Sequence, residues 1–259
     1  MSYDSPLIKR EAETMSRISH QRNIVEYIGA QPGDGYFDIM MELKFGNVQG
    51  LINGGLFIQQ PTSIDPLLLQ VLQALNYLAS ESIIHRDVKP ENILYTPLTT
   101  GSYLYQLGDF GLANLVVHQT PKMDVWSLFV TLTYAVNIRD FQSKPLHTTA
   151  LRVQAIQDAA ADDILRPIRF MAEVDLSHRA TAGDVLDCVF NGAGRTTRRK
   201  QAPDTATGSY EEQLQPLETL VEGQCRGNRD SPVKRIPPGE AAASMRGKRL
   251  MTATHTTGK

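Results

Sequence analysis

Four polar residues near the middle of the chain carry side chains that can take part in catalysis. Asp87, Lys89 and Asn92 lie close together in the sequence, and Asp109 follows further along. A carboxylate can accept a proton, an ammonium group can hold an anion, and carboxylate and amide oxygens are the ligands that Mg²⁺ prefers. Each also has a structural alternative, since Asp87 can cap a turn, Asn92 can satisfy loop backbone and Lys89 can be solvated. Together the four groups supply the positioning and charge neutralisation that phosphoryl transfer requires.

The residues around these four follow a known order. The stretch HRDVKPEN (85–92) comes after a long amphipathic segment, and it is followed by Asp-Phe-Gly (109–111) and Asp-Val-Trp-Ser-Leu (124–128). These three motifs in this order resemble the catalytic loop, the magnesium-binding triplet and a buried helix of eukaryotic-type protein kinases. The Asp-x-Lys pattern at Asp87 and Lys89 resembles the serine/threonine class, and the overall pattern resembles kinases of fungal type.

The resemblance implies a role for each of the four residues. Asp87 would orient the attacking hydroxyl and accept its proton, and Lys89 would reach the transferring phosphate. Asn92 and Asp109 would hold the Mg²⁺ ions that bridge the phosphates. The implied function is transfer of the ATP γ-phosphate to a serine or threonine hydroxyl of a protein substrate, with ATP and Mg²⁺ as cofactors.

The same resemblance assigns two further sets of positions. ATP would contact the gatekeeper and hinge strip together with the catalytic-loop and magnesium positions, which are Met41, Glu42, Leu43, Lys44, Lys89, Glu91, Asn92, Leu94 and Asp109. Structural roles, in packing or in holding loops, would fall to Glu11, Met15, His85, Phe110, Asp124 and Arg179.

Hydrophobic periodicity predicts the elements that position these residues. The expected fold is α+β, a mostly helical kinase C-lobe (45–194) with a remnant N-lobe (1–44) of one helix and a β-hairpin. The expected elements are helices at 5–19, 64–78 and 122–136, a last helix beginning at Thr181 with a capping box to Asp184, and strands at 23–30, 36–43, 92–95 and 103–107, with turns at 33–35 and 99–101.

Two parts of the kinase pattern are missing. Asp124 follows Asp109 by only 15 residues, whereas the family interval is about 35 because an activation segment with an Ala-Pro-Glu motif intervenes. Arg179 matches the arginine that pairs with that absent glutamate, and we expect it to move to solvent because a buried unpaired charge is costly.

The front of the N-lobe is missing as well. No glycine-rich phosphate loop and no lysine-bearing strand precede Glu11, which matches the glutamate that pairs with that lysine. Glu11 is therefore expected to be a solvated helix residue. The strand at 36–43 would lack its usual neighbour, and its open edge is a possible site for a partner.

These losses leave alternatives to an active enzyme. The chain can be a catalytically dead, pseudokinase-like fragment that acts as a binding module. It can also be the product of a defective gene model, a splice form or a decayed copy.

Composition sets the remaining bounds. The 259 residues are 41% hydrophobic and 21% charged with a net charge of −2, values that are ordinary for a globular protein. No signal peptide or membrane span is evident, and Cys188 and Cys225 form no metal or redox pattern, so we expect an intracellular protein, cytoplasmic or nuclear. Residues 195–259 read as a basic, disordered tail whose cluster at 195–200 suits nuclear import, an anionic partner or simple solvation. Nothing indicates clear nucleic-acid or membrane binding.

Overall fold

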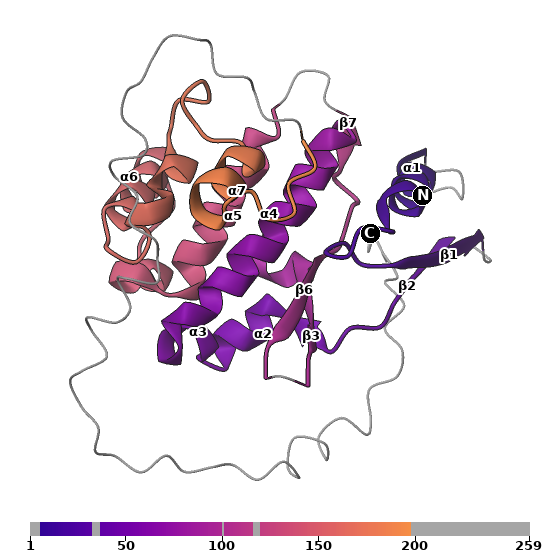
Figure 1. Ribbon diagram of the computed structural model, residues 1–259, viewed down its shortest axis with the longest axis horizontal. Helices are drawn as coiled ribbons and strands as arrows, with labels where there is room; N and C mark the ends of the chain where they lie inside the picture. Colours follow the sequence, from indigo (N-terminus) through magenta and orange to yellow (C-terminus); the bar gives the residue numbers. More distant parts are fainter. Residues whose placement is uncertain (1–5, 33–36, 100, 116–119, 198–259) are drawn as a thin grey trace.

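The computed structural model describes residues 6–32, 37–99, 101–115 and 120–197. The predicted turns at 33–35 and 99–101 lie wholly or partly outside these ranges, as does the tail from residue 198. Figure 1 shows a large helical part and, beside it, a small unit made of one helix and two strands. This is the α+β arrangement expected from the sequence.

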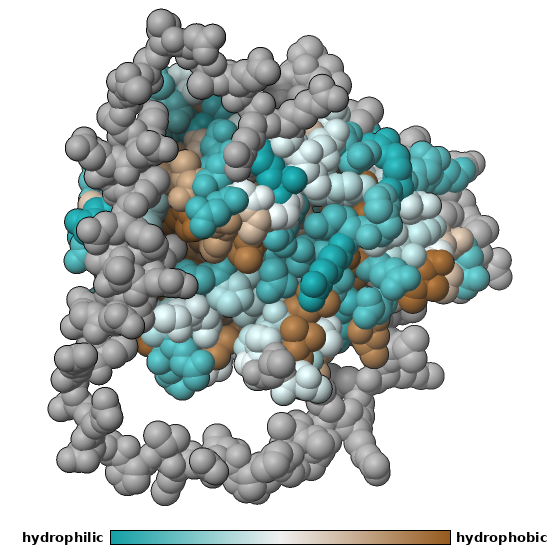
Figure 2. Space-filling view, in the orientation of Figure 1, coloured by the Kyte–Doolittle hydropathy of each residue, from teal (hydrophilic) through white to brown (hydrophobic). Residues whose placement is uncertain are grey.

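The small unit contains the N-terminal helix and a hairpin. Helix α1 spans Pro6–Ile18, and strands β1 (Tyr27–Pro32) and β2 (Phe37–Met41) pair antiparallel. Within the described residues β2 pairs with β1 alone. This unit and the strip that follows it carry exposed apolar side chains, which are Ile28, Met40, Met41, Leu43 and Phe45. Figure 2 shows hydrophobic surface, in brown, on the same side of the molecule.

The first predicted strand was placed too early. The sequence predicts a strand at 23–30, but β1 begins at Tyr27. Residues 23–25 instead join the helical part, because Val25 N donates to Leu107 O and Leu107 N donates to Asn23 O, at 3.0 and 2.8 Å. The extended backbone of this stretch therefore pairs with the helical part of the molecule and not with β2.

The helical part is built around two long helices. Helix α4 (Ile64–Ser80) buries an apolar face at helical spacing, and α5 (Lys122–Ala135) is apolar nearly all round and lies in the core. The shorter helices are α2 (Val48–Asn53), α3 (Leu56–Gln59), α6 (Thr149–Ala160) and α7 (Ala182–Phe190), with 3₁₀ turns at Pro61–Ser63, Pro90–Asn92, Ile138–Ser143 and Arg166–Ala172.

Short strands complete this part. Strands β3 (Gly46–Asn47), β5 (Ile93–Pro97) and β6 (Tyr103–Leu107) form one sheet, and β4 (Ile83–Ile84) pairs with β7 (Asn114–Leu115). The predicted capping box at the last helix is confirmed, since Asp184 N donates to Thr181 Oγ1 and Thr181 N donates to Asp184 Oδ2.

Buried polar contacts join the small unit to the helical part. The amide of Asn23 donates to Gln70 Oε1 on α4 and to Tyr105 O on β6, each at 3.1 Å. The amide of Gln106 donates to Ile24 O at 3.0 Å. These bonds, with Met15 and Ile18 of α1 fully buried in the core, hold the small unit in place.

None of the helices in the described ranges is both long enough and apolar enough to cross a membrane.

Candidate active site

The loop after β4 is held by a buried carboxylate on α5. Asp124 is 2% exposed, and its two carboxylate oxygens accept hydrogen bonds from His85 N and Arg86 N, both at 2.8 Å. Arg86 has a positive φ of 71°, which is costly for a residue with a side chain. Burial raises the pKa of Asp124 to about 6, although both backbone bonds act in the opposite direction. Asp124 therefore fixes the strained entry to the loop.

His85 is held as a neutral imidazole in one tautomer. Its ring is fully buried, Nε2 donates to Gly108 O at 3.0 Å, and Nδ1 accepts from Asp87 N at 3.3 Å. The ring packs edge-on against Phe110, with centroids 4.8 Å apart. Burial lowers the pKa of His85 to about 4. The residue thus links the Asp87 backbone to the chain just before Asp109.

This placement predicts a pH-dependent loss of stability. Because the pKa of His85 falls from 6.5 to about 4 on folding, the unfolded chain takes up the proton first as the pH drops. Above pH 6.5 the ring is neutral in both states and has no effect on the pH dependence. As the pH falls from 6.5 to 4 the free energy of unfolding decreases by about 3 kcal/mol in total, because the buried ring resists the proton that the unfolded chain accepts.

Urea denaturation of the protein and of a His85→Phe variant at pH 7.5 and pH 4.5 would measure this contribution. The stability advantage of the wild type over the variant should shrink by about 2.5 kcal/mol at the lower pH, most of the full change. Comparing the two proteins cancels the contributions of Asp124 and Asp65, whose raised pKa values of about 6 act with the opposite sign. An advantage that does not change with pH would contradict the assignment.

Asp87, Lys89 and Asn92 form one hydrogen-bonded cluster. Lys89 Nζ lies 2.6 Å from Asp87 Oδ2, and Asn92 Nδ2 donates to the same oxygen at 2.8 Å and to Asp87 O at 2.9 Å. The hydrogen bond to Asp87 raises the pKa of Lys89. The Asp87 side chain is 24% exposed, so a substrate can reach it. Its hydrogen bonds with Lys89 and Asn92 fix its orientation.

Asp109 is brought next to this cluster by the backbone of Gly108, a residue that the sequence reasoning did not single out. Gly108 N donates to Asn92 O at 2.9 Å, and Asp109 is exposed with a positive φ of 61°. A Cβ atom at Gly108 would lie only 3.2 Å from Leu94 Cδ1. The close packing there favours glycine, and its position directly before the Asp-Phe-Gly triplet was the available signal.

The predicted hinge strip runs between two backbone anchors. Glu42 N donates to Glu26 O at 2.9 Å, and Phe45 N donates to Tyr95 O at 3.0 Å. Leu43 is 94% exposed, whereas the Lys44 side chain is 4% exposed and its Nζ lies 2.6 Å from Glu42 Oε2. The amide of Glu42 is thus already used. Met41 is exposed at the end of β2, Glu91 is exposed in a 3₁₀ turn, and Leu94 is half-buried on β5.

Helix α1 brings two predicted residues to the same region. Met15 is 1% exposed and belongs to the core cluster that also contains Phe110. Glu11 is half-buried, and a Cβ atom at Gly111 would lie 3.4 Å from its Oε2. The Glu11 carboxylate therefore lies beside the Asp-Phe-Gly turn, which differs from the solvated position expected from the sequence.

The expectation for Arg179 was wrong. Instead of moving to solvent, this residue is 8% exposed, and its guanidinium lies over the ring of Trp126 at 4.6 Å. It donates to three backbone carbonyls, those of Glu173 at 2.6 Å, Val174 at 3.2 Å and Lys122 at 3.4 Å. Carbonyl dipoles and an aromatic face thus replace the missing carboxylate.

Strand β7 and the start of α5 flank the shortened segment after Asp109. Strand β7 pairs with β4 just before the catalytic loop, and α5 begins at Lys122. Lys122 Nζ donates to Leu176 O and Ser177 O at 2.8 and 3.1 Å. The start of α5 is therefore fixed to the Arg179 loop, although residues 116–119 lie outside the described ranges.

Comparison with known proteins agrees with this geometry. The family model for the protein kinase domain matches residues 3–137, and the chain belongs to the protein kinase family. It is 25% identical over 215 residues to the probable serine/threonine-protein kinase nek3 of Dictyostelium discoideum, and 27% identical over 213 residues to the serine/threonine-protein kinase DCLK2 of Mus musculus. Each match covers 70% of this chain.

A shorter match is 36% identical over 112 residues, 42% of this chain, to the probable serine/threonine-protein kinase fhkD of Dictyostelium discoideum. The chain spans only a small part of these relatives: 19% of nek3, 28% of DCLK2 and 15% of fhkD. All three relatives are serine/threonine kinases by their names.

Proposed function

We propose that this chain transfers the γ-phosphate of ATP to a serine or threonine hydroxyl of a protein substrate. The observation that carries the proposal is the Asp87 cluster. One carboxylate, oriented by Lys89 and Asn92, is open to solvent directly beside the backbone that carries Asp109. Such an arrangement suits a general base next to a phosphate-binding position.

The residues present fit magnesium bound together with ATP. Asn92 commits its amide nitrogen to Asp87, which makes its amide oxygen the atom that can meet a metal ion, and Asp109 adds a carboxylate. Among the described residues no group of three or more His, Cys, Asp or Glu side chains could hold a metal ion alone. That is the usual situation for Mg²⁺, which is held by one or two carboxylates and by substrate phosphates. When bound, the ion would neutralise charge on those phosphates.

The remaining steps fall to side chains of the chain itself. Asp87 would accept a hydrogen bond from the substrate hydroxyl and then its proton, while Lys89 would turn from Asp87 toward the phosphate as a point charge. The backbone of residues 43–44 lies between the two anchors of the hinge strip and would meet adenine above Leu94. The relatives are serine/threonine kinases by their names, which supports that substrate class.

Binding of MgATP is the first requirement, and a thermal melt tests it. With MgATP at about 100 times its dissociation constant, the folded protein should gain about 2.7 kcal/mol, which raises the melting temperature by roughly 5–10 °C. The shift should require Mg²⁺ and should be much smaller in an Asp109→Asn variant. A cooperative melt with no Mg²⁺-dependent shift would contradict the proposal and would favour a binding module without catalysis.

Transfer itself is tested with γ-labelled ATP, Mg²⁺ and a generic protein substrate, followed by identification of the modified residue. Label on serine or threonine is expected. Label on tyrosine alone, or no label in a protein that does bind MgATP, would contradict the proposed reaction.

A further inference from the structure

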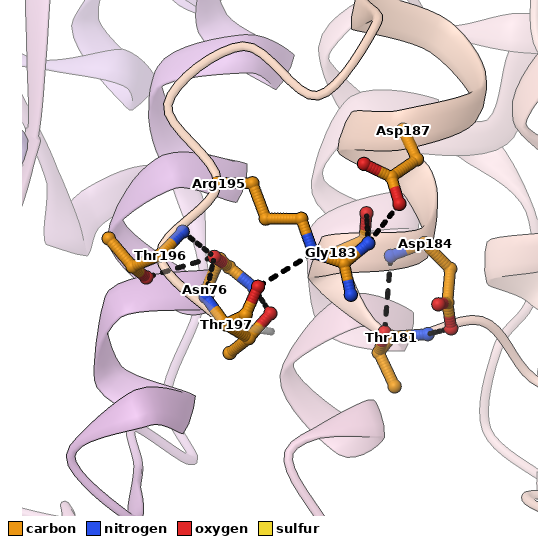
Figure 3. A network of polar contacts seen from close by, with 8 residues as sticks. All are labelled: Asn76, Thr181, Gly183, Asp184, Asp187, Arg195, Thr196 and Thr197. Atoms are coloured by element: carbon orange, nitrogen blue, oxygen red, sulfur yellow. Dashed lines mark hydrogen bonds and ion pairs between the residues drawn. The ribbon is translucent and has the colours of Figure 1, made fainter. Parts of the chain in front are cut away.

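A buried asparagine side chain binds the chain that follows α7 (Figure 3). Asn76 of α4 is 1% exposed, and its Oδ1 accepts from Thr196 N at 2.7 Å, Thr196 Oγ1 at 2.9 Å and Thr197 N at 3.2 Å. Its Nδ2 donates to Thr197 Oγ1 at 2.7 Å. The first three residues of the predicted tail, 195–197, are thus part of the fold.

Arg195 adds a buried ionic contact to the same attachment. Its side chain is 9% exposed, and Nη1 pairs with Asp187 and donates to Gly183 O at 3.1 Å. Its Nε donates to Thr197 O at 2.9 Å. Because the guanidinium is largely shielded from water, salt screens this pair less than it would screen a fully exposed pair.

Two glycines make room for the segment. A Cβ atom at Gly183 would lie 2.9 Å from Thr197 Oγ1, 3.0 Å from Asn76 Nδ2 and 3.1 Å from Arg195 Cζ. Gly194 has a φ of 69°, and a Cβ atom there would collide with Gln73, whose amide donates to Ala193 O at 3.2 Å. The capping box of α7 fixes the helix start that carries Gly183 (Figure 3). The half-buried Thr197 hydroxyl is therefore closely packed on the side that faces Asn76 and Gly183.

We propose that Thr197 is a modification site: its free hydroxyl locks residues 193–197 onto α4 and α7, and a phosphate on it releases them. A phosphate adds about two negative charges and three oxygens, for which the space between Asn76 and Gly183 has no room. It would also compete with the Asp187 carboxylate for the Arg195 guanidinium, the pair that helps to hold the segment.

The surrounding sequence suits such a modification. Thr197 is preceded by Arg195 and followed by Arg198, Arg199 and Lys200, a basic stretch that a protein kinase with an acidic substrate groove would bind. In the step, the Thr197 oxygen attacks the γ-phosphorus of ATP, the bond between that phosphorus and the ADP oxygen breaks, ADP leaves, and the hydroxyl proton passes to the catalytic base of the acting kinase. The reaction takes place on the opened segment and then keeps it open.

Hydrogen exchange of the full chain tests the lock. In a Thr197→Glu variant, which places negative charge at the site, the amides of residues 196 and 197 should exchange at least about tenfold faster than in the wild type. Trypsin should also cleave after Arg195 more readily. Gly183→Ala should give the same result by steric exclusion alone, while it improves the helix propensity of α7. Thr197→Ser, which keeps the hydroxyl, and Thr207→Glu, outside the described residues, should match the wild type. Unchanged protection in both Thr197→Glu and Gly183→Ala would overturn the proposal.

The modification is tested with a second kinase, so that the result does not depend on the proposed activity of this chain. The Asp87→Asn protein, with and without Gly183→Ala, is incubated with MgATP and a serine/threonine kinase that selects basic segments. Mass spectrometry should find phosphate on Thr197, about tenfold faster with Gly183→Ala, and the phosphorylated protein should exchange like Thr197→Glu. No phosphate on Thr197 in either protein, or phosphate with full protection of residues 196 and 197, would overturn the assignment.

Discussion

Replacing Asp87 by asparagine is expected to lower the rate of phosphate transfer by about 10²–10⁴-fold, the range over which general bases contribute to catalysis. Asparagine keeps the size of the side chain and can still accept hydrogen bonds from Lys89 and Asn92. It cannot take a proton from the substrate hydroxyl. The initial rate of label transfer at saturating MgATP measures the loss.

Two comparisons separate loss of the base from loss of the fold. Asp163→Asn, an exposed aspartate whose side chain is 70% accessible, should transfer phosphate at the wild-type rate. The free energy of unfolding of Asp87→Asn should lie within about 0.5 kcal/mol of the wild-type value. MgATP should still raise the melting temperature of the variant. If Asp87→Asn retained the full transfer rate, Asp87 would not be the base.

The largest effect on stability is expected from Asp124→Ala, at about 3–5 kcal/mol. The variant removes the two carboxylate oxygens that accept from His85 N and Arg86 N, and each buried N–H left without an acceptor costs about 1–3 kcal/mol. It also frees Arg86, whose positive φ persists only because the surroundings enforce it. Some of the loss is offset because a carboxylate that is costly to bury has gone.

Urea denaturation at pH 7.5, where Asp124 is ionised, measures this change, and Asp163→Ala is the matched control with an expected change within about 0.5 kcal/mol. A loss of less than 1 kcal/mol in Asp124→Ala would mean that water or a shifted backbone satisfies the two amides. The transfer rate should fall together with stability, because the same two bonds orient the loop that carries Asp87.

Local patterns predicted the elements well where a single segment decides its own structure. The periodicity of apolar residues placed α4 and α5 to within two residues at their ends, because a helix that buries one face needs that spacing. Thr181 and Asp184 predicted the start of α7 because a capping box is made within one turn. The eight consecutive residues 85–92 predicted the position of the candidate site in the chain because the motif lies within one short loop.

Contacts between distant segments could not be predicted in this way. Arg179 was expected in solvent because the sequence offered no carboxylate, yet folding brings three carbonyls and Trp126 to it. Residues 195–197 read as disordered by composition, but Asn76, more than a hundred positions earlier, binds them. Residues 23–25 read as the start of a strand, but their backbone pairs with β6.

The sequence by itself therefore determined the family, the chemical groups of the candidate site and the helices that carry them. These depend on residue types at short spacing, where the chain has little freedom. Only the tertiary structure decided how a strained catalytic loop is held, what replaces the partner of Arg179, and where the chain leaves the fold. Each of these depends on which polar atoms of remote segments meet in a buried space, and buried polar groups are stable only where such partners converge.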